Sequence, residues 1–154
     1  MNIKKIFYIL LTVILSLVYL TGCAEKKPVT VEIFNQIMTD AGFQITNATM
    51  QTTGDSISAI SLAIKEEYQV EFYVFTQNKY ADLAFQQNKS IFEGYVGKEK
   101  NRISKSIGEY DYYSLVTNGQ CYILARVDNT LLYTVADDTY KNDIAKLIKE
   151  LEYE

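Results

Sequence analysis

Three segments of the chain place apolar residues every three or four positions, which is the spacing of one helical face. The first segment lies between Thr30 and Gly42, which suit the N-cap and the C-cap of a helix. The second covers residues 78–93 and the third covers residues 138–151. The pattern therefore predicts three amphipathic helices.

Other segments are rich in β-branched and aromatic residues and alternate as strands do. They cover residues 57–65, 68–75, 110–117, 120–127 and 130–136, with a weaker strand at 43–46. Asn118-Gly119 and Asp128-Asn129 separate the last three segments, and both dipeptides accept the positive φ that two-residue hairpins need. Residues 98–108 are polar, and we predict a loop there.

This order of elements predicts one α+β domain over residues 30–154. We expect an antiparallel sheet with a β-meander over residues 110–136 and three helices packed mainly on one face. The length of the chain suits a single domain with one hydrophobic core.

Two-residue turns fix the strand register of the predicted meander. One face of the sheet then carries Tyr113, Leu115, Tyr122, Leu124 and Tyr133, and the opposite face is also largely apolar. In an antiparallel sheet with one solvent-exposed face, apolar and polar residues alternate more regularly along each strand. The Tyr113 face is therefore either covered by the remaining strands or exposed as an interaction surface rich in tyrosine.

The same register places Asp111 opposite Arg126, on the face of Tyr113. Arg126 is the only basic residue between Lys105 and Lys141. Opposite charges in such a cross-strand position contribute about 0.2–1 kcal/mol. Two interpretations remain open, because Arg126 either pairs with Asp111 or extends to solvent at the margin of the sheet.

A strand-to-helix junction occurs twice in similar form. Tyr73 precedes Tyr80 by seven residues, and Tyr133 precedes Tyr140 by the same distance, so the two junctions lie 60 residues apart. A duplicated unit and a chance match both account for this echo.

The N-terminus carries Lys4 and Lys5, and residues 6–20 follow without a charge. This is the layout of a secretory signal peptide, and the apolar run is shorter than the span of about 20 residues that crosses a bilayer. The sequence LTGC at positions 20–23 resembles the lipobox of bacterial lipoproteins. The resemblance implies that Cys23 receives a diacylglyceryl group and becomes the first residue after cleavage.

The resemblance divides the chain into a lipoprotein signal peptide (1–22), a lipidated tether (23–29) and the folded domain. It implies a lipid-anchored protein, labelled by palmitate, on the extracytoplasmic face of the cell membrane. An uncleaved membrane anchor with an incidental cysteine is the alternative. The stretches MTDAGFQI and RVDNTLLYTVADDTYKNDI also resemble small lipoproteins of low-GC Gram-positive bacteria that have no assigned activity, which implies no function.

The chain contains no histidine, which removes the commonest general base and metal ligand together with the Ser-His-Asp and Cys-His arrangements. The GDSI sequence at 54–57 looks like the GDSL block of an esterase family, but that family also needs a histidine. Asp137, Asp138 and Asp143 form the densest acidic patch, and they suit a helix N-terminus better than a calcium site. Cys121 is predicted to be a small buried apolar residue.

The signal segment carries no acidic residue, so all 19 acidic residues and all but two of the 15 basic ones remain after it. Such an acidic domain is unsuited to nucleic acid, whose phosphates need clustered Lys and Arg. We predict no catalytic residue, no cofactor and no metal site. The expected function is a non-enzymatic binding or interaction domain with a protein or envelope partner, and a small cell-envelope enzyme that uses carboxylates is the alternative. The oligomeric state stays open.

Overall fold

The computed structural model describes residues 26–51, 54–65, 67–95, 97 and 100–154. Its helices are α2 (Val31–Asp40), α3 (Asn78–Gly94) and α4 (Lys141–Glu150). Its strands are β1 (Gln44–Asn47), β2 (Ile57–Ile64), β3 (Gln69–Phe75), β4 (Lys100–Ile107), β5 (Tyr110–Thr117), β6 (Gln120–Val127) and β7 (Thr130–Asp137). Short 3-10 helices cover Thr49–Gln51 and Asp138–Tyr140.

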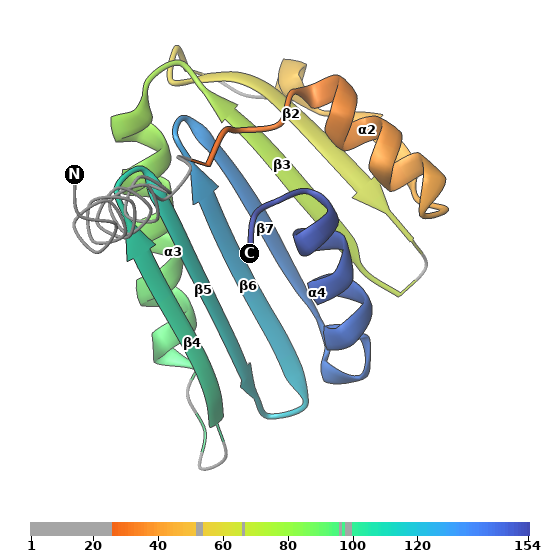
Figure 1. The fold of residues 1–154 in the computed structure, drawn as a ribbon, viewed down its shortest axis with the longest axis vertical. Coiled ribbons are helices and arrows are strands. Elements are labelled where there is room, and N and C mark those ends of the chain that lie inside the picture. Colours follow the sequence, from red (N-terminus) through yellow and green to blue (C-terminus); the bar gives the residue numbers. More distant parts are fainter. Residues whose placement is uncertain (1–25, 52–53, 66, 96, 98–99) are drawn as a thin grey trace, which may run out of the picture.

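The strands form one seven-stranded antiparallel sheet in the order β1-β2-β3-β7-β6-β5-β4 (Figure 1). The pairing of β3 with β7 joins the first three strands to the C-terminal four. The predicted α+β class and the antiparallel meander are therefore confirmed.

The turns of the meander have the predicted two-residue form. Asn118 and Gly119 adopt φ values of 53° and 75° between β5 and β6, and Asp128 adopts 50° between β6 and β7. Because the turns set the register, Asp111 lies opposite Arg126 as expected. The register of β6 with β7 also follows the prediction.

A strand occupies the region that the sequence predicted to be a loop. β4 pairs with β5 along its whole length, through a turn at Gly108 with φ 58°. The loop prediction was wrong because β4 is an edge strand whose side chains at 101–107 are exposed, so burial does not impose an apolar alternation. Lysines on such an edge discourage pairing with another chain.

Helices lie on both faces of the sheet (Figure 1). On the face of α2 and α4, Phe34 stacks on Phe72 with 4.8 Å between ring centroids, and α4 buries Ile144 and Ile148 beside them. The second core cluster lies under α3 and contains Ala81, Phe85, Phe92, Tyr113, Leu115 and Leu124. Two of the three helices thus share one face, as predicted, and α3 covers the other.

The 60-residue echo extends only to the strands. β3 and β7 are neighbours, and Phe72 pairs with Leu132, which lies 60 residues later in the chain. However, Tyr80 packs in the core cluster under α3 and Tyr140 packs in the cluster on the opposite face. If a twofold axis related the two strand-to-helix units, it would run between β3 and β7, perpendicular to the sheet. Such an axis would place the two equivalent helices on the same face. The two helices lie on opposite faces, so the repeat does not include them.

Candidate binding site

The predicted interaction face is mostly covered by α3. Tyr113, Leu115 and Leu124 have no exposed surface, because Phe85 and Phe92 of the helix pack over them. The exposed-surface interpretation is therefore wrong for these three residues. Cover was the expected alternative, although the covering element is a helix and not another strand.

The two outer tyrosines of that face keep partial exposure. Tyr122 packs between Phe92 and Tyr95, with ring centroids 4.9 Å and 5.6 Å away. Tyr133 lies on β7, opposite Leu124 of β6, and its ring is 5.5 Å from that of Phe92. Of these two tyrosines, Tyr133 lines a hollow in the surface.

This hollow, here called the aromatic groove, runs beside α3 where one helix is too narrow to cover the sheet. Its volume is about 410 Å³. The strands β2, β3 and β7 form its floor, and α3 forms one wall. Its lining residues are Ile57, Glu71, Tyr73, Phe75, Ala84, Asn88, Leu131 and Tyr133.

Strand pairing places the polar groups of the aromatic groove. Glu71 lies directly opposite Tyr133 in the β3–β7 pair, and Tyr73 lies opposite Leu131. The Tyr73 hydroxyl donates a hydrogen bond to one carboxylate oxygen of Glu71, and Gln69 Nε2 donates to the other at 2.6 Å. The carboxylate is thus held in one orientation beside the aromatic rings.

Both tyrosine hydroxyls in the aromatic groove keep their protons at neutral pH. Burial raises the pKa of Tyr73 well above its ordinary value, and the hydrogen bond and charge of Glu71 raise it further. Burial, followed by the charge of Glu71, also raises the pKa of Tyr133. With both tyrosines neutral, Glu71 is the single carboxylate in a lining whose other side chains are apolar, aromatic or amide.

This lining suits binding better than catalysis. Paired acid and base chemistry needs two carboxylates across a cleft, and the aromatic groove has one. Within the described ranges, no group of three or more Asp, Glu, Cys or His residues is arranged to hold a metal ion. Concave, mostly apolar sites with a few fixed polar groups are typical of ligand pockets.

A larger hollow of about 610 Å³ lies between α2 and α4. Charged groups of both signs surround it, namely Asp40, Lys65, Glu67, Asp143, Lys146 and Glu150. At its base, Lys65 Nζ lies 4.3 Å from the centroid of the Phe43 ring, and burial raises the pKa of Tyr68 to about 12. Mixed charges of this kind are typical of a solvated surface and select no class of ligand.

A third hollow, of about 420 Å³, opens over Arg126. Arg126 Nε donates to Asp111 Oδ2 at 2.7 Å, and Nη1 donates to Glu109 Oε2 at 2.9 Å and to the Asp128 carbonyl at 3.3 Å. Burial alone would lower the pKa of Arg126, but the hydrogen bonds to Glu109 and Asp111 outweigh it and raise the pKa. Two carboxylates neutralise the guanidinium, so we interpret this group as structural and not as an anion site.

The predicted Asp111–Arg126 pair is therefore confirmed, and its surroundings differ from the expected sheet margin. The two side chains are only 7% and 5% exposed. The alternative in which Arg126 extends to solvent is wrong, because α3 and the neighbouring turns enclose this end of the sheet.

Cys121 is buried and carries no disulfide, as the sequence predicts for a small apolar residue. Burial raises the pKa of its thiol to about 11, which keeps the thiolate scarce at neutral pH. Cys23, the predicted lipidation site, lies outside the described residues. In the part of the chain that is described, no helix has the length and apolar character needed to cross a bilayer.

Comparisons with known proteins give little further information. No protein-family model matches the chain, and no curated protein matches it. Among solved structures, a GTP binding regulator from Thermotoga maritima is similar over 80% of this chain and 84% of its own. Its sequence identity is 14% and its TM-score is 0.45.

Sequence reasoning missed Glu71, Tyr73 and Asn88 as site residues. One signal was present, because Glu71 is the only charged residue in β3, a strand that is otherwise rich in apolar residues. A charge isolated in a strand usually has a particular partner or a polar hollow. The position of that hollow depends on the β3–β7 pairing and on which face α3 covers, and neither follows from local pattern.

Proposed function

We propose that this protein is a lipoprotein anchored to the outer side of the cytoplasmic membrane, and that its domain binds a partner without catalysing a reaction. The observation that carries the proposal is LTGC at 20–23, directly after a basic segment and an apolar run. Charge, apolar length and the four-residue box agree with a lipoprotein signal peptide.

The anchor follows from the chemistry of acyl chains in bilayers. Each buried methylene contributes about 0.8 kcal/mol, and one acyl chain alone binds a membrane only marginally. The two chains of a diacylglyceryl group on Cys23 would hold the domain durably at the surface. The tether of residues 23–29 is short, so the domain stays near the headgroups.

The binding role rests on the aromatic groove. Tyrosine and other aromatic side chains are enriched where proteins bind one another, because they offer large rigid contact surfaces with a polar end. In the groove, Tyr73 and Tyr133 present such surfaces, and Glu71 supplies one oriented acceptor for a donor on the partner. An apolar group of an envelope protein, flanked by a hydrogen-bond donor, fits this lining.

Cys23→Ser is expected to abolish palmitate labelling and to stop signal cleavage at this site, because serine has no thiol to accept the diacylglyceryl group. Labelling with radioactive palmitate, followed by separation of membrane and soluble fractions, measures both effects. The control is Cys121→Ser, which removes the other cysteine and should leave labelling unchanged. A Cys23→Ser protein that still takes up palmitate would overturn the proposed anchor.

Ala84→Trp is expected to abolish partner binding, because Ala84 is on the α3 wall of the aromatic groove and an indole there fills the space. The measurement is affinity purification of the full lipidated chain from its own membranes. Leu83→Trp is the matched control, since Leu83 is adjacent on the same helix and 54% exposed. The proposed binding role is contradicted if the Ala84→Trp protein recovers the same partner as the natural chain. It is also contradicted if the natural chain recovers no partner.

A further inference from the structure

The edge strand β4 exposes two large apolar side chains. Ile103 is 44% exposed and Ile107 is 65% exposed, and Lys105 lies between them on the same side of the strand. These residues pair with Ser114, Tyr112 and Tyr110 of β5, and so they share the sheet face of α2 and α4. Figure 1 shows that no described helix covers this face over β4 and β5.

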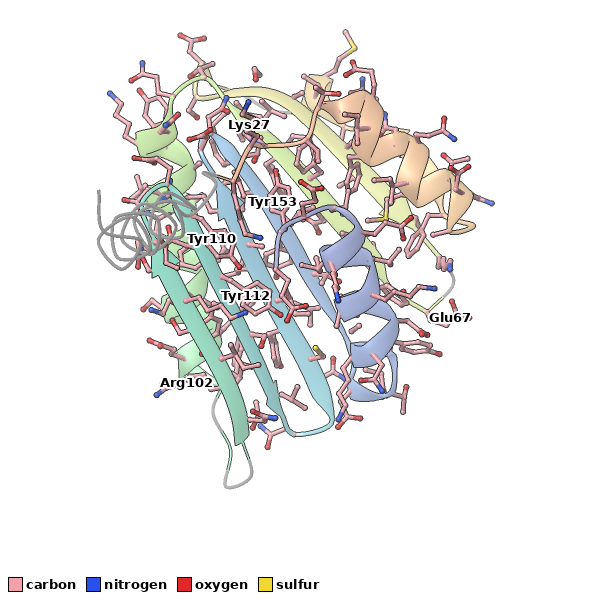
Figure 2. All side chains as sticks on the ribbon, viewed as in Figure 1. Lys27, Glu67, Arg102, Tyr110, Tyr112 and Tyr153 are labelled. Carbon is pink, nitrogen blue, oxygen red and sulfur yellow. The ribbon has the colours of Figure 1, made fainter. Side chains whose placement is uncertain are left out.

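The N-terminal end of the described chain is fixed at the same place. Lys26 Nζ lies 4.6 Å from the centroid of the Tyr110 ring and donates to the Glu152 carbonyl at 2.8 Å. The Tyr110 hydroxyl in turn donates to the Tyr153 carbonyl at 3.2 Å. Figure 2 shows Tyr110 and Tyr112 on this open part of the sheet.

Chain length limits how far the anchor can be from this surface. Three peptide links join Lys26 to Cys23, and they reach at most about 11 Å. Ile107 is the direct cross-strand neighbour of Tyr110, the residue that Lys26 covers. A lipid attached to Cys23 therefore holds Ile107 close to the level of the headgroups.

Two basic residues, Lys26 and Lys105, lie together at this edge, beside the acidic residues Glu152 and Glu154 of the C-terminal segment. Burial, together with the nearby charge of Lys105, lowers the pKa of Lys26, and the charges of Glu152 and Glu154 partly offset this. The mutual repulsion of the two lysines is relieved when phosphates lie between the ammonium groups. Glu109, the acidic residue of the β4–β5 turn, is already paired with Arg126 at 2.9 Å.

We propose that the β4 edge lies against the anionic membrane surface in the lipidated protein, with Ile103 and Ile107 entering the headgroup region and Lys105 contacting lipid phosphates. This inference rests on the proposed lipid anchor at Cys23. The apolar face of an interfacial amphipathic helix enters such a boundary by about 5–10 Å, and the same boundary accepts the two exposed isoleucines of β4. The aromatic groove is on the opposite face of the sheet, so this orientation turns it toward the partner and away from the lipid.

Tryptophan fluorescence can test the orientation, because the natural chain contains no tryptophan. The full lipidated chain with Ile107→Trp is reconstituted in vesicles of phosphatidylglycerol and phosphatidylcholine that contain a brominated lipid as quencher. We expect several-fold stronger quenching than for Leu83→Trp, whose position on α3 is similarly exposed but on the opposite face. Ile103→Trp is a second reporter, and it should also be quenched.

Three results would overturn the inference, and they are distinguishable. Equal quenching of the Ile107→Trp and Leu83→Trp proteins, with palmitate labelling intact, refutes the orientation and leaves the proposed anchor in place. Protection of the Ile107→Trp indole from aqueous acrylamide without quenching by lipid indicates that a second copy pairs along β4. Absence of palmitate on Cys23 refutes the anchor itself, and the orientation with it.

Discussion

Asp111→Asn will lower the free energy of unfolding by about 3–5 kcal/mol, because it leaves the charge of a buried arginine without its main partner. In the native protein, Arg126 Nε and Nη2 each lie 2.7 Å from Asp111 Oδ2. The remaining carboxylate contact, from Glu109, is half exposed and does not replace that of Asp111. Equilibrium unfolding in urea, monitored by circular dichroism, measures the loss.

A double-mutant cycle with Arg126→Gln isolates the pair from the rest of the core. The doubly substituted protein should be more stable than the two single losses predict, by at least about 1 kcal/mol of coupling energy. Arg102→Gln is the control, because Arg102 forms an exposed pair with Glu93 at 3.7 Å and exposed pairs contribute about 0–1 kcal/mol. Additive losses at Asp111 and Arg126 would contradict the assignment of this pair as a stabilising unit.

The sequence predicted the register that places Asp111 opposite Arg126, but it left open whether the two side chains pair. Register follows from Asn118-Gly119, since a two-residue turn leaves one way to count back along both strands. Burial does not follow from register. An exposed cross-strand pair contributes about 0.2–1 kcal/mol, whereas removing one partner of a buried pair costs about 3–5 kcal/mol because it leaves an unpaired buried charge.

The same distinction explains the other differences between prediction and structure. The meander is local, and its turns and alternation can be counted from the sequence. The pairing of β3 with β7 joins residues such as Phe72 and Leu132 that are far apart in the chain, and no local signal specifies it. The aromatic groove depends on that pairing and on the position of α3, so only Tyr133 of its residues was predicted.

Edge strands pose a related difficulty for prediction. β4 pairs on one side only and exposes its side chains, so its residues resemble those of a loop. The two isoleucines at 103 and 107 were the remaining signal, because a solvated loop has no need of large apolar residues four positions apart. In the proposed orientation, their exposure has a function at the membrane surface.

Tyr153→Ala is expected to lower the free energy of unfolding by about 3–5 kcal/mol, as large-to-small changes of buried aromatic residues do. Tyr153 has no exposed surface, although it is the penultimate residue of the printed sequence. Its ring meets that of Phe72 edge to face at 6.4 Å, and its backbone nitrogen donates to the Ile148 carbonyl at 2.9 Å. The substitution would leave a cavity between α4 and the sheet, and urea unfolding measures its effect.

Tyr153→Phe is the matched control for the hydroxyl, which lies 2.5 Å from Thr130 Oγ1. Thr130 already donates its one hydroxyl proton to the Val127 carbonyl at 2.6 Å, so Tyr153 is the donor in this contact. Losing one such hydrogen bond should lower stability by about 0.5–1.5 kcal/mol at neutral pH. A loss with Tyr153→Ala that is no larger than this would show that the ring is dispensable.

The pH dependence of stability separates the ring from its hydroxyl. Burial raises the pKa of Tyr153 to about 12, whereas an unfolded tyrosine has its ordinary pKa of about 10. Because the native state holds this proton more tightly, the stabilisation is complete below pH of about 10 and is lost as pH rises toward about 12. Tyr68 and Tyr110, whose pKa values are also raised to about 12, add to the alkaline loss. We therefore expect the Tyr153→Phe protein to lose less stability than the natural chain between pH of about 10 and about 12. Urea unfolding at each pH measures the free energy of unfolding of both proteins. If that free energy falls equally steeply with pH in both, the result contradicts a buried Tyr153 hydroxyl.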